Sequence, residues 1–390
     1  MKKVLLGSTA LVAAGLIAGH AEAADGVKLS LGGYYRGVAG VMFDDFDGAA
    51  AGLEDDLRDY VFKQDVEVHF RGETTLDNGL TVGAVVQLEG QTSGDQIDEV
   101  YAYFSGGWGE LRFGDDDDAL AQLCSITPSA ASNFGADSPF FSFSNSAAAG
   151  NAPVFAYAGT NGTCYGMTGD STKLIYFSPN FGGFSFAMSF APDNTEDTRN
   201  AVSGAGTRFE NNPGQNSDAL SLAANFNHDF NGVTLNIGGG ATWSFDKEAS
   251  AEDEAADYQG YASVGFFGFT IGGAIELRNN FANNFGDGSD SLTYGAGVTY
   301  NWDAWTVGVG WTHGDYEVGQ PGTVITAGVL TLTGDVDQNQ DIFALTAAYA
   351  LGPGITVDGV VEWVDSDSNG LGTSSDYQGI SFGLGTLISF

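Results

Sequence analysis

The chain has 390 residues and is strongly acidic, with 13 Lys and Arg against 50 Asp and Glu. It therefore lacks the basic surface that binding to nucleic acid requires. It is not a disordered acidic polymer either, because 43% of its residues are hydrophobic, 13% are aromatic and only 16% are charged. Its 58 glycines and only 8 prolines favour many twisted strands and tight turns over helices.

Residues 1–23 have the features of a secretory signal peptide. Lys2 and Lys3 precede a short apolar stretch, and Ala21-Glu22-Ala23 supplies the small-x-small pattern of a cleavage site. The apolar stretch is too short to span a bilayer as a helix, and no later stretch is long enough. We therefore expect an exported mature chain, residues 24–390, that is either soluble or a closed β-barrel, because only helices and closed barrels satisfy their backbone groups in lipid.

After the signal peptide the chain repeats one pattern: a strand of about ten alternating residues, a very short turn, a second strand and a longer polar loop. In one such strand Val66, Val68 and Phe70 share a face, and Asp77-Asn78-Gly79 then suits a tight turn. The pattern predicts about sixteen strands, an even number that puts both chain ends on the periplasmic side. The strands are expected near residues 27–43, 65–71, 80–88, 96–105, 109–113, 172–178, 184–191, 218–228, 233–245, 258–266, 269–278, 291–302, 305–316, 341–351, 355–365 and 376–390.

The two faces of each predicted strand differ in a way that favours lipid outside and water inside. In one strand Leu292, Tyr294 and Val298 alternate with Thr293 and Gly297, whereas a soluble barrel would place its apolar residues inside. Aromatic residues also gather at strand ends, as in the girdles of membrane barrels. These residues are Phe184, Tyr258, Phe269, Tyr300, Trp302, Trp305 and Trp311. The predicted fold class is all-β: one transmembrane antiparallel β-barrel domain over residues 24–390.

A long segment, residues 114–171, interrupts the strand pattern and contains both cysteines, Cys124 and Cys164. An even cysteine count in an exported protein favours a disulfide over two free thiols. Metal binding by these cysteines is disfavoured because no histidine lies near either one. The segment also holds several aromatic residues, which we expect to pack it against the barrel wall. They are Phe134, Phe140, Phe141 and Phe143, beside Pro139.

The chain stops on Phe390, which closes an alternating apolar series that includes Ile380, Phe382, Leu384 and Ile388. A strand that is patterned in this way up to the last residue is typical of outer-membrane barrels. We expect it to pair with the first strand, near residues 27–43, and so to leave no free sheet edge.

Two stretches resemble a known family. Glu99-Val100-Tyr101-Ala102-Tyr103-Phe104 runs into Gly106-Gly107-Trp108-Gly109-Glu110-Leu111-Arg112-Phe113-Gly114, which resembles the strand-turn-strand before the constriction loop of Gram-negative general porins. Residues 74–80 and Phe390 are also similar to that family, particularly to its alphaproteobacterial members. The resemblance implies sixteen-stranded trimers in the outer membrane. It also implies that the third extracellular loop, residues 114–171, folds into the lumen and narrows it, and that Phe390 is recognised during assembly.

Charged residues predict how such a pore would select its solutes. Strand parity puts five basic residues on the inner face, as a basic wall: Lys28, Arg36, Lys63, Arg71 and Arg112. Five acidic residues of the loop are expected to oppose it: Asp115, Asp116, Asp117, Asp118 and Asp137. Opposed rows of charge set a transverse field, and acidic groups in a pore favour cations. The run Asp115 to Asp118 stands where many relatives have a basic residue, which argues against anion preference.

The sequence therefore predicts passive diffusion of small hydrophilic solutes and ions through a weakly cation-selective pore, without catalytic residues or a required cofactor. Its partners would be outer-membrane lipid, lipopolysaccharide and two further copies of the chain. The four aspartates from Asp115 to Asp118 are also candidate Ca²⁺ ligands, because Ca²⁺ prefers several oxygens. They have no spaced Ca²⁺-loop motif, and pairing with Arg112 or simple solvation are the alternatives.

Three other functions stay open at this point. A sugar-specific channel would stack its solute on inward aromatic rings such as Tyr34, Tyr101 or Tyr103. An outer-membrane hydrolase would use His313 beside Asp315 and Glu317 near the outer rim. An adhesive barrel would bind divalent cations among lipopolysaccharides through its acidic loops.

Overall fold

The computed structural model describes residues 26–48, 58–91, 96–142, 161–193, 217–245, 255–280, 290–318, 336–370 and 373–390. The proposed signal peptide and Phe143 lie outside the described residues. Within these ranges the chain forms sixteen strands and one short helix, α2 (Ala119–Leu123). The strands are β1 (Lys28–Gly48), β2 (Tyr60–Thr75), β3 (Thr81–Glu89), β4 (Ile97–Gly106), β5 (Gly109–Asp115), β6 (Thr172–Phe177), β7 (Phe184–Asp193), β8 (Ser217–Asp229), β9 (Val233–Phe245), β10 (Ala255–Phe266), β11 (Phe269–Asn279), β12 (Asp290–Trp302), β13 (Trp305–Val318), β14 (Val336–Gly352), β15 (Ile355–Gly370) and β16 (Thr373–Ser389).

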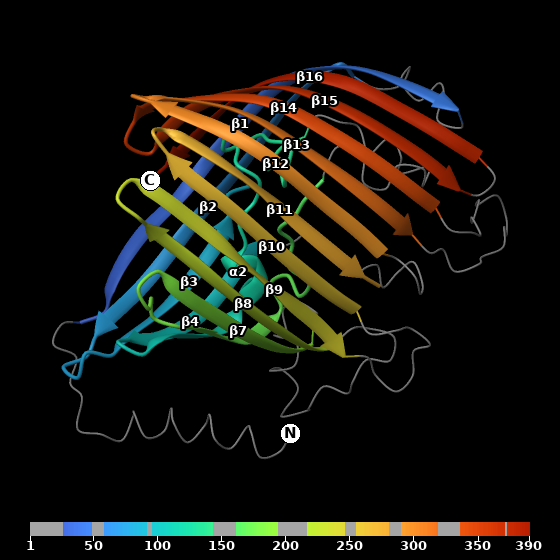
Figure 1. Cartoon of the computed structure of the whole chain (residues 1–390). Helices are drawn as coiled ribbons and strands as arrows, with labels where there is room; N and C mark the ends of the chain where they lie inside the picture. The colour runs from blue at the N-terminus through green and yellow to red at the C-terminus, as the bar shows by residue number, and fades with distance from the viewer. Residues whose placement is uncertain are drawn as a thin grey trace.

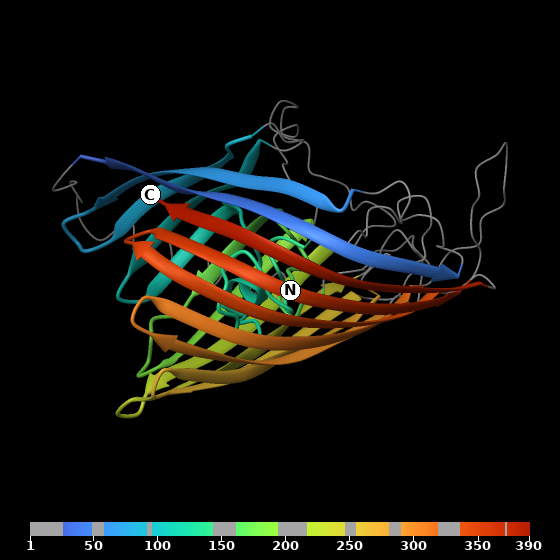
Figure 2. The same ribbon diagram turned by 90° about the horizontal axis from the view of Figure 1, so that it is seen from above.

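The strands form one closed antiparallel barrel, in which each strand pairs with its neighbours in sequence and β16 returns to pair with β1 (Figures 1 and 2). Phe390 completes this seam: its N–H donates to the Gly33 carbonyl at 3.1 Å, and its own carbonyl accepts from the Gly33 N–H at 3.0 Å. The predicted sixteen-strand barrel, closed by its first and last strands, is confirmed. Closure satisfies the backbone groups that an open edge would leave unpaired.

The described turns at one end of the barrel are short. Phe267-Gly268 joins β10 to β11 and Asp303-Ala304 joins β12 to β13. Phe267 and Asp303 both have φ of 49°, the left-handed conformation that tight hairpins require. The connections at the other end are longer, and the longest is residues 116–171 between β5 and β6. We call it the β5–β6 segment, and the structure describes its residues 116–142 and 161–171.

Side chains alternate between the two faces of the barrel as the sequence predicts. On β15, Trp363 is 37% exposed, while its neighbours Glu362 and Val364 are 2% and 1% exposed. Aromatic rings cluster on the outer face near the short turns, where Trp302 stacks on Trp305 and Phe269 contacts Tyr300. The outer face is thus apolar with an aromatic band, as lipid contact requires. No helix among the described residues has the length and hydropathy of a membrane-spanning helix.

The structure differs from the sequence-based expectation on part of the inner face. We predicted small and polar residues there, but over β1 and β14–β16 several inward residues are apolar and buried. They are Val38, Met42, Ile342, Val360, Val364 and Tyr377. The physical reason is that the β5–β6 segment covers this part of the wall, so it faces protein instead of water.

The outward apolar face predicts how the barrel responds to a buried charge. Leu345 is 60% exposed on β14, between Phe343 and Tyr349 on the same face. Leu345→Arg should destabilise the folded barrel in lipid by about 2–4 kcal/mol, the cost of a cation near the bilayer midplane. Urea titration of the protein in vesicles, followed by heat-modifiable electrophoretic mobility, measures this loss.

The matched control is Phe230→Arg, because Phe230 is 51% exposed in the short turn between β8 and β9. It should cost roughly 0–1 kcal/mol, as expected near the interface. Equal costs at the two positions would contradict the assignment of Leu345 to the lipid-facing side.

Candidate functional site

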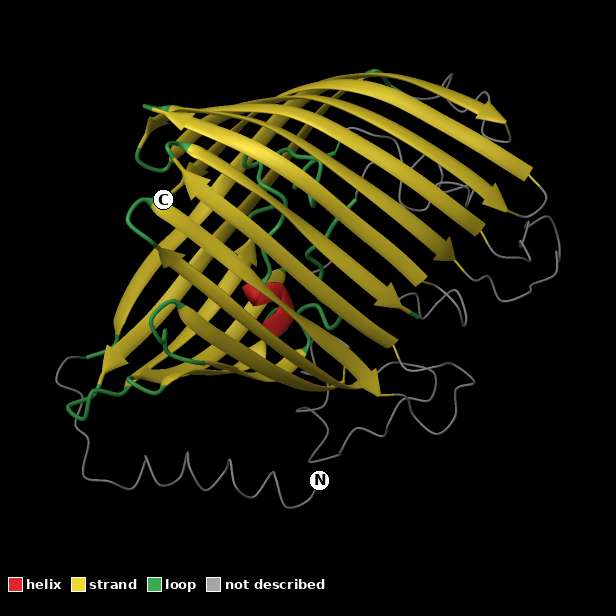
Figure 3. Ribbon diagram, viewed as in Figure 1, coloured by secondary structure: helices red, strands yellow, loops and turns green. Residues whose placement is uncertain are grey.

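The β5–β6 segment is the candidate functional site, and Figure 3 shows its helix α2 in red and its loops in green, surrounded by the strands. Near the start of the segment, Asp118 is the N-cap residue of α2. The Asp118 carboxylate accepts hydrogen bonds from the N–H groups of Leu120 and Ala121, at 3.0 Å each, and so satisfies the first donors of α2. It also accepts from the Met167 N–H at 3.1 Å, which ties the returning part of the segment to its start.

Glycines on the inner face make room for the segment. A Cβ added at Gly297 of β12 would lie 2.4 Å from the carbonyl oxygen of Pro128. A Cβ at Gly240 of β9 would lie 2.9 Å from a methyl carbon of Leu120 and 2.2 Å from a backbone oxygen. A larger residue at either position would therefore push the segment or the neighbouring strand away.

Asp358 on β15 is the strongest single anchor from the wall. Its side chain is 2% exposed and accepts hydrogen bonds from the N–H groups of Ser132 and Asn133 at 2.9 Å each, and from Asn133 Nδ2 at 2.8 Å. Hydrogen bonds to a buried carboxylate are among the stronger ones in proteins. No sequence pattern distinguishes this role, because Asp358 looks like any other inward polar residue of a strand.

Side chains from many other strands hold the rest of the segment. Each of these contacts joins one wall side chain to a backbone group of the segment. They are Ser189 with Ala119 (3.0 Å), Ser221 with Leu120 (2.9 Å), Tyr261 with Leu123 (2.8 Å), Glu276 with Tyr165 (3.3 Å), Thr312 with Ala136 (2.5 Å) and Thr346 with Ala130 (3.1 Å). The segment is thus attached from β7 round to β15.

Apolar packing adds to these polar contacts. Phe134 and Phe141, with Ala131 and Ala136, pack into the buried cluster on β1 and β14–β16 described above. This agrees with the expectation that the aromatic residues of the segment pack it against the wall.

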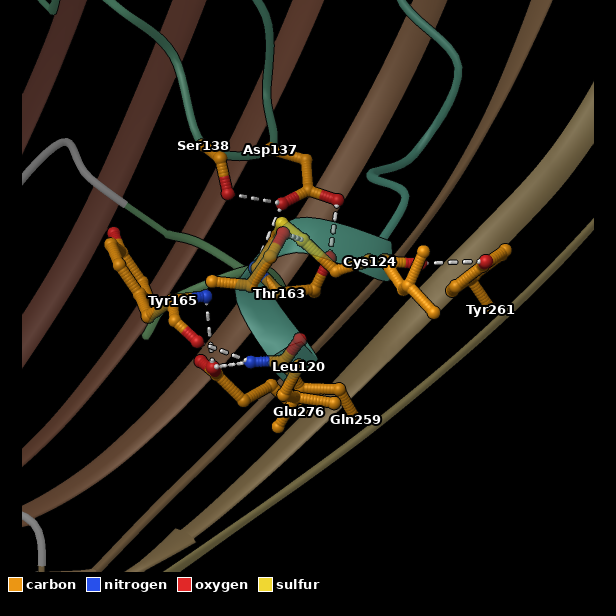
Figure 4. The surroundings of a disulfide bond; sticks show 12 residues. Leu120, Cys124, Asp137, Ser138, Thr163, Tyr165, Gln259, Tyr261 and Glu276 are labelled. Atoms are coloured by element: carbon orange, nitrogen blue, oxygen red, sulfur yellow. Dashed lines mark hydrogen bonds between the residues drawn. A yellow bond between two sulfur atoms is a disulfide. The ribbon is translucent and has the colours of Figure 1, made fainter. Parts of the chain in front are cut away.

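A disulfide joins Cys124 to Cys164, with their Cα atoms 5.8 Å apart, as predicted. Figure 4 shows this bond between the end of α2 and the returning part of the segment. Asp137 lies beside it and is 3% exposed. Its carboxylate accepts from the N–H groups of Thr127 (2.7 Å) and Thr163 (2.9 Å) and from the Thr163 hydroxyl (2.7 Å). The sequence predicts Asp137 in an acidic row facing the basic wall, but its carboxylate accepts hydrogen bonds within the segment instead.

Three of the five predicted basic residues contact the segment. Arg36 donates to the Ser132 carbonyl at 3.5 Å, and its guanidinium lies 3.7 Å from the ring centre of Phe140. Lys63 donates to the Ser142 carbonyl at 2.6 Å. Arg112 forms ion pairs with Glu110 at 2.7 Å and with Asp116 at 3.0 Å.

The other two basic residues lie nearer the short turns. Lys28 starts β1 opposite Glu73, and Arg71 lies over the ring of Tyr103 at 5.1 Å. Sequence reasoning also missed Lys173 of β6, which is 1% exposed and donates to the carbonyls of Asp116 and Gly169. The available signal was a single lysine in a mostly apolar strand, on the face opposite to that of Leu174.

The wall of β1–β5 is not basic in balance. At least six carboxylates share the inner face with the five basic residues: Asp65, Glu67, Glu73, Glu89, Glu99 and Glu110. The prediction of a basic wall is therefore wrong, because Asp65 and Glu67 lie on the same face of β2 as Lys63 and Arg71. The carboxylates of the same parity make this wall mixed in charge.

The consecutive aspartates from Asp115 to Asp118 do not act as one cluster, because their side chains have different partners. Asp115 ends β5 on the same face as the outward Phe113, and it accepts a hydrogen bond from Thr172. Asp116 pairs with Arg112 and also accepts from Gln122 at 2.5 Å. Asp118 caps α2. Among the described residues, no group of three or more His, Cys, Asp or Glu side chains is arranged to hold a metal ion.

Burial and mutual repulsion change the ionisation of the acidic residues that line the segment. Burial raises the pKa of Asp116 above its usual value, although Arg112 opposes this shift. Burial and the neighbouring Asp118 and Asp116 raise the pKa of Asp117. Burial, together with Asp117 and Asp98, raises the pKa of Asp170 to about 7.

The residues that a sugar-specific channel or a hydrolase would use make contacts with other protein groups. The inward Tyr103 donates its hydroxyl to Glu73 at 2.5 Å, and Arg112 lies 4.8 Å from the ring centre of Tyr101. Tyr34 donates to Glu67 and contacts Phe140 edge-on. Tyr101 and Tyr103 are buried and Tyr34 is partly buried, which disfavours solute stacking on these rings. His313 lies on the same face of β13 as the outward Val309, and it contacts Asp341 at 3.1 Å and Asp315 at 3.3 Å. This acid-histidine cluster faces away from the interior.

The Asp358 anchor gives a prediction for the segment. Asp358→Asn replaces a carboxylate that accepts three hydrogen bonds with a weaker acceptor, which should cost about 1.5–3 kcal/mol of local stability. The amides of Ser132 and Asn133 should then exchange hydrogen roughly 10- to 100-fold faster. Hydrogen exchange measured by mass spectrometry on the folded barrel tests this.

The control is Glu362→Gln, four residues along the same inward face of β15. Glu362 is 2% exposed, and its Oε1 has no hydrogen-bond partner among the described residues. It should leave exchange in the segment unchanged. Equal exchange in Asp358→Asn and the unaltered protein would show that Asp358 does not hold the segment.

Comparisons with known protein families and with solved structures agree with each other. A family model described as Gram-negative porin matches residues 7–369. No curated protein matches. Similar solved structures include a porin refined at 1.8 Å resolution, with 16% identity, a TM-score of 0.55 and coverage of 93% of this chain and 100% of that one.

Two further solved structures have the same fold. OmpT of Vibrio cholerae, in a structure titled as its trimer form, has 11% identity, a TM-score of 0.55 and coverage of 94% of this chain and 100% of that one. An anion-selective porin from Comamonas acidovorans has 13% identity, a TM-score of 0.53 and coverage of 93% and 100%. At such identities the similarity shows the fold alone. With the family match over nearly the whole sequence, the chain belongs to the Gram-negative porin family, whose members are outer-membrane β-barrel channels and not enzymes.

Proposed function

We propose that this porin passes small hydrophilic solutes and ions by passive diffusion, with a weak preference for cations, and that the β5–β6 segment is its constriction. The contacts of the segment with inward side chains of β7–β15, and with Arg36 and Lys63 on the opposite wall, support a position across the lumen. A segment held on both sides narrows a channel that sixteen strands would otherwise leave wide.

One observation carries the cation preference: carboxylates outnumber cations around the constriction. The wall of β1–β5 contributes at least six carboxylates to its five basic residues, and the segment adds Asp116, Asp117 and Asp170 against Lys173. Acidic groups lining a pore favour cations. The Comamonas porin is described as anion-selective. A shared fold therefore does not fix the ion selectivity, and the charges that line the pore must determine it.

We further propose a homotrimer embedded in outer-membrane lipid, with lipopolysaccharide at the long-loop end. The trimer form reported for OmpT supports the oligomer. The outer face over β1, β2 and β16 also carries strongly exposed apolar residues, including Phe62 at 79% and Leu384 at 68%, which a second copy or lipid would cover.

Reversal potentials in a potassium chloride gradient test the selectivity. The unaltered protein should favour K⁺ over Cl⁻, and a clear preference for Cl⁻ would overturn the proposal. Arg71→Gln should raise the preference for K⁺ by a few-fold at most, because it removes one inward positive charge, which lies over the Tyr103 ring.

Asp315→Asn is the control for Arg71→Gln, because Asp315 lies on the outer face with His313. It should leave the reversal potential unchanged. A shift as large as that of Arg71→Gln would mean that selectivity is set outside the barrel interior.

The raised pKa of Asp170 predicts a pH dependence. With a pKa of about 7, Asp170 is mainly charged above this pH and mainly neutral below it, so the preference for K⁺ should fall as the pH drops from about 8 to about 6. Reversal potentials across this range measure the effect.

Asp170→Asn should remove most of this dependence, because the altered residue does not titrate. If the unaltered protein and Asp170→Asn change equally between these pH values, then Asp170 does not contribute to selectivity.

A further inference from the structure

Buried oxygens converge where β10 and β11 meet the returning part of the β5–β6 segment. The side-chain Nε2 of Gln259 lies within hydrogen-bond distance of three of them: the Tyr165 carbonyl at 2.6 Å, Glu276 Oε1 at 2.9 Å and Asp257 Oδ2 at 3.1 Å. Figure 4 shows Gln259 and Glu276 on the wall beside Tyr165. An amide nitrogen carries only two protons, so it cannot serve three acceptors fully.

The same residues leave other oxygens without partners. Asp257 and Glu276 are 0% and 2% exposed, and Gln259 is 7% exposed. Asp257 Oδ1 and Gln259 Oε1 are buried and have no hydrogen-bond partner among the described residues. A buried carboxylate oxygen without a partner is costly, so the arrangement calls for a further positively charged or donating group.

The nearby charges do not supply it in full. Arg278 is the cross-strand partner of Asp257 and lies 5.4 Å from the ring centre of Tyr165. Asp118 of the segment also acts electrostatically on Asp257. Two carboxyl groups, those of Asp257 and Glu276, thus share one guanidinium. They also lie within hydrogen-bond distance of each other in a buried place, so a proton or a cation is needed between them.

We propose that this group of oxygens binds a hard divalent cation, with Ca²⁺ as the best fit. A half-turn of the Gln259 amide would exchange its Nε2 for Oε1. Asp257, Glu276, Gln259 and the Tyr165 carbonyl would then offer oxygens to one point. Ca²⁺ accepts carboxylate, amide and backbone carbonyl oxygens in irregular geometry, whereas Mg²⁺ demands a near-ideal octahedron.

The site would tie the segment to the wall. Asp257, Gln259 and Glu276 come from the barrel, whereas Tyr165 belongs to the segment and follows Cys164 of the disulfide. A bound cation would therefore fix the returning part of the segment next to the point where the disulfide fixes it to α2. Binding is independent of conduction, so its failure and a failure of the proposed pore function are separate results.

Equilibrium binding of Ca²⁺ to the folded, full-length mature protein in detergent, after removal of metals with a chelator, tests the proposal. The unaltered protein should bind one Ca²⁺ per chain more tightly than Mg²⁺. Asp257→Asn and Glu276→Gln should each weaken binding roughly tenfold or more, because ligand charge sets affinity for Ca²⁺. Glu362→Gln is the matched control, since it removes a buried inward carboxylate elsewhere, and it should bind as the unaltered protein does.

A luminescent substitute locates the ion. Tb³⁺ bound at this site should be sensitised by the ring of Tyr165 and displaced by Ca²⁺. Tyr165→Phe keeps the carbonyl ligand and should retain Ca²⁺ binding while it loses much of the luminescence. Two results would overturn the proposal: an unaltered protein that binds no Ca²⁺ tightly, or binding that Asp257→Asn and Glu276→Gln both leave unchanged.

Discussion

Buried carboxylates that accept backbone N–H groups are the interaction on which the interior of this barrel depends. The Asp358 carboxylate on the wall accepts hydrogen bonds from the N–H groups of Ser132 and Asn133, and the Glu276 carboxylate accepts one from the N–H group of Tyr165. Within the segment, Asp118 and Asp137 do the same for the start of α2 and for Thr163. Each carboxylate satisfies donors that a segment without regular secondary structure would otherwise leave unpaired away from water.

This interaction explains why the inner face is not uniform. Where the segment lies against the wall, the strands offer glycine, apolar or hydrogen-bonding residues, as at Gly297, Val360 and Thr312. Where the wall of β1–β5 faces the remaining interior, charged residues of both signs alternate, as at Glu67, Arg71 and Glu73. The same barrel therefore has one part of its wall that packs against the segment and one part that is lined by charged residues.

The fold could be predicted from the sequence because alternation is a local property of each strand. The strand number, the bounds of the long segment and the β1–β16 seam followed from it. The roles of Asp118, Asp137 and Asp358 could not, because they depend on partners far away in the sequence. The prediction of a basic wall was wrong for a simpler reason: carboxylates of the same parity lie beside its lysines and arginines, and only the basic residues were counted.

The central claim is that the β5–β6 segment lies across the interior and sets the width of the pore. Ser132 tests it most directly, because its side chain is exposed while its backbone bonds to Asp358 and Arg36. In Ser132→Cys, a bulky thiol-reactive cation should cause a stepwise fall in single-channel conductance. The same reagent on Ser374→Cys, at the long-loop end of β16 and also exposed, should have little effect. An unchanged conductance after complete labelling of Ser132→Cys would contradict the account.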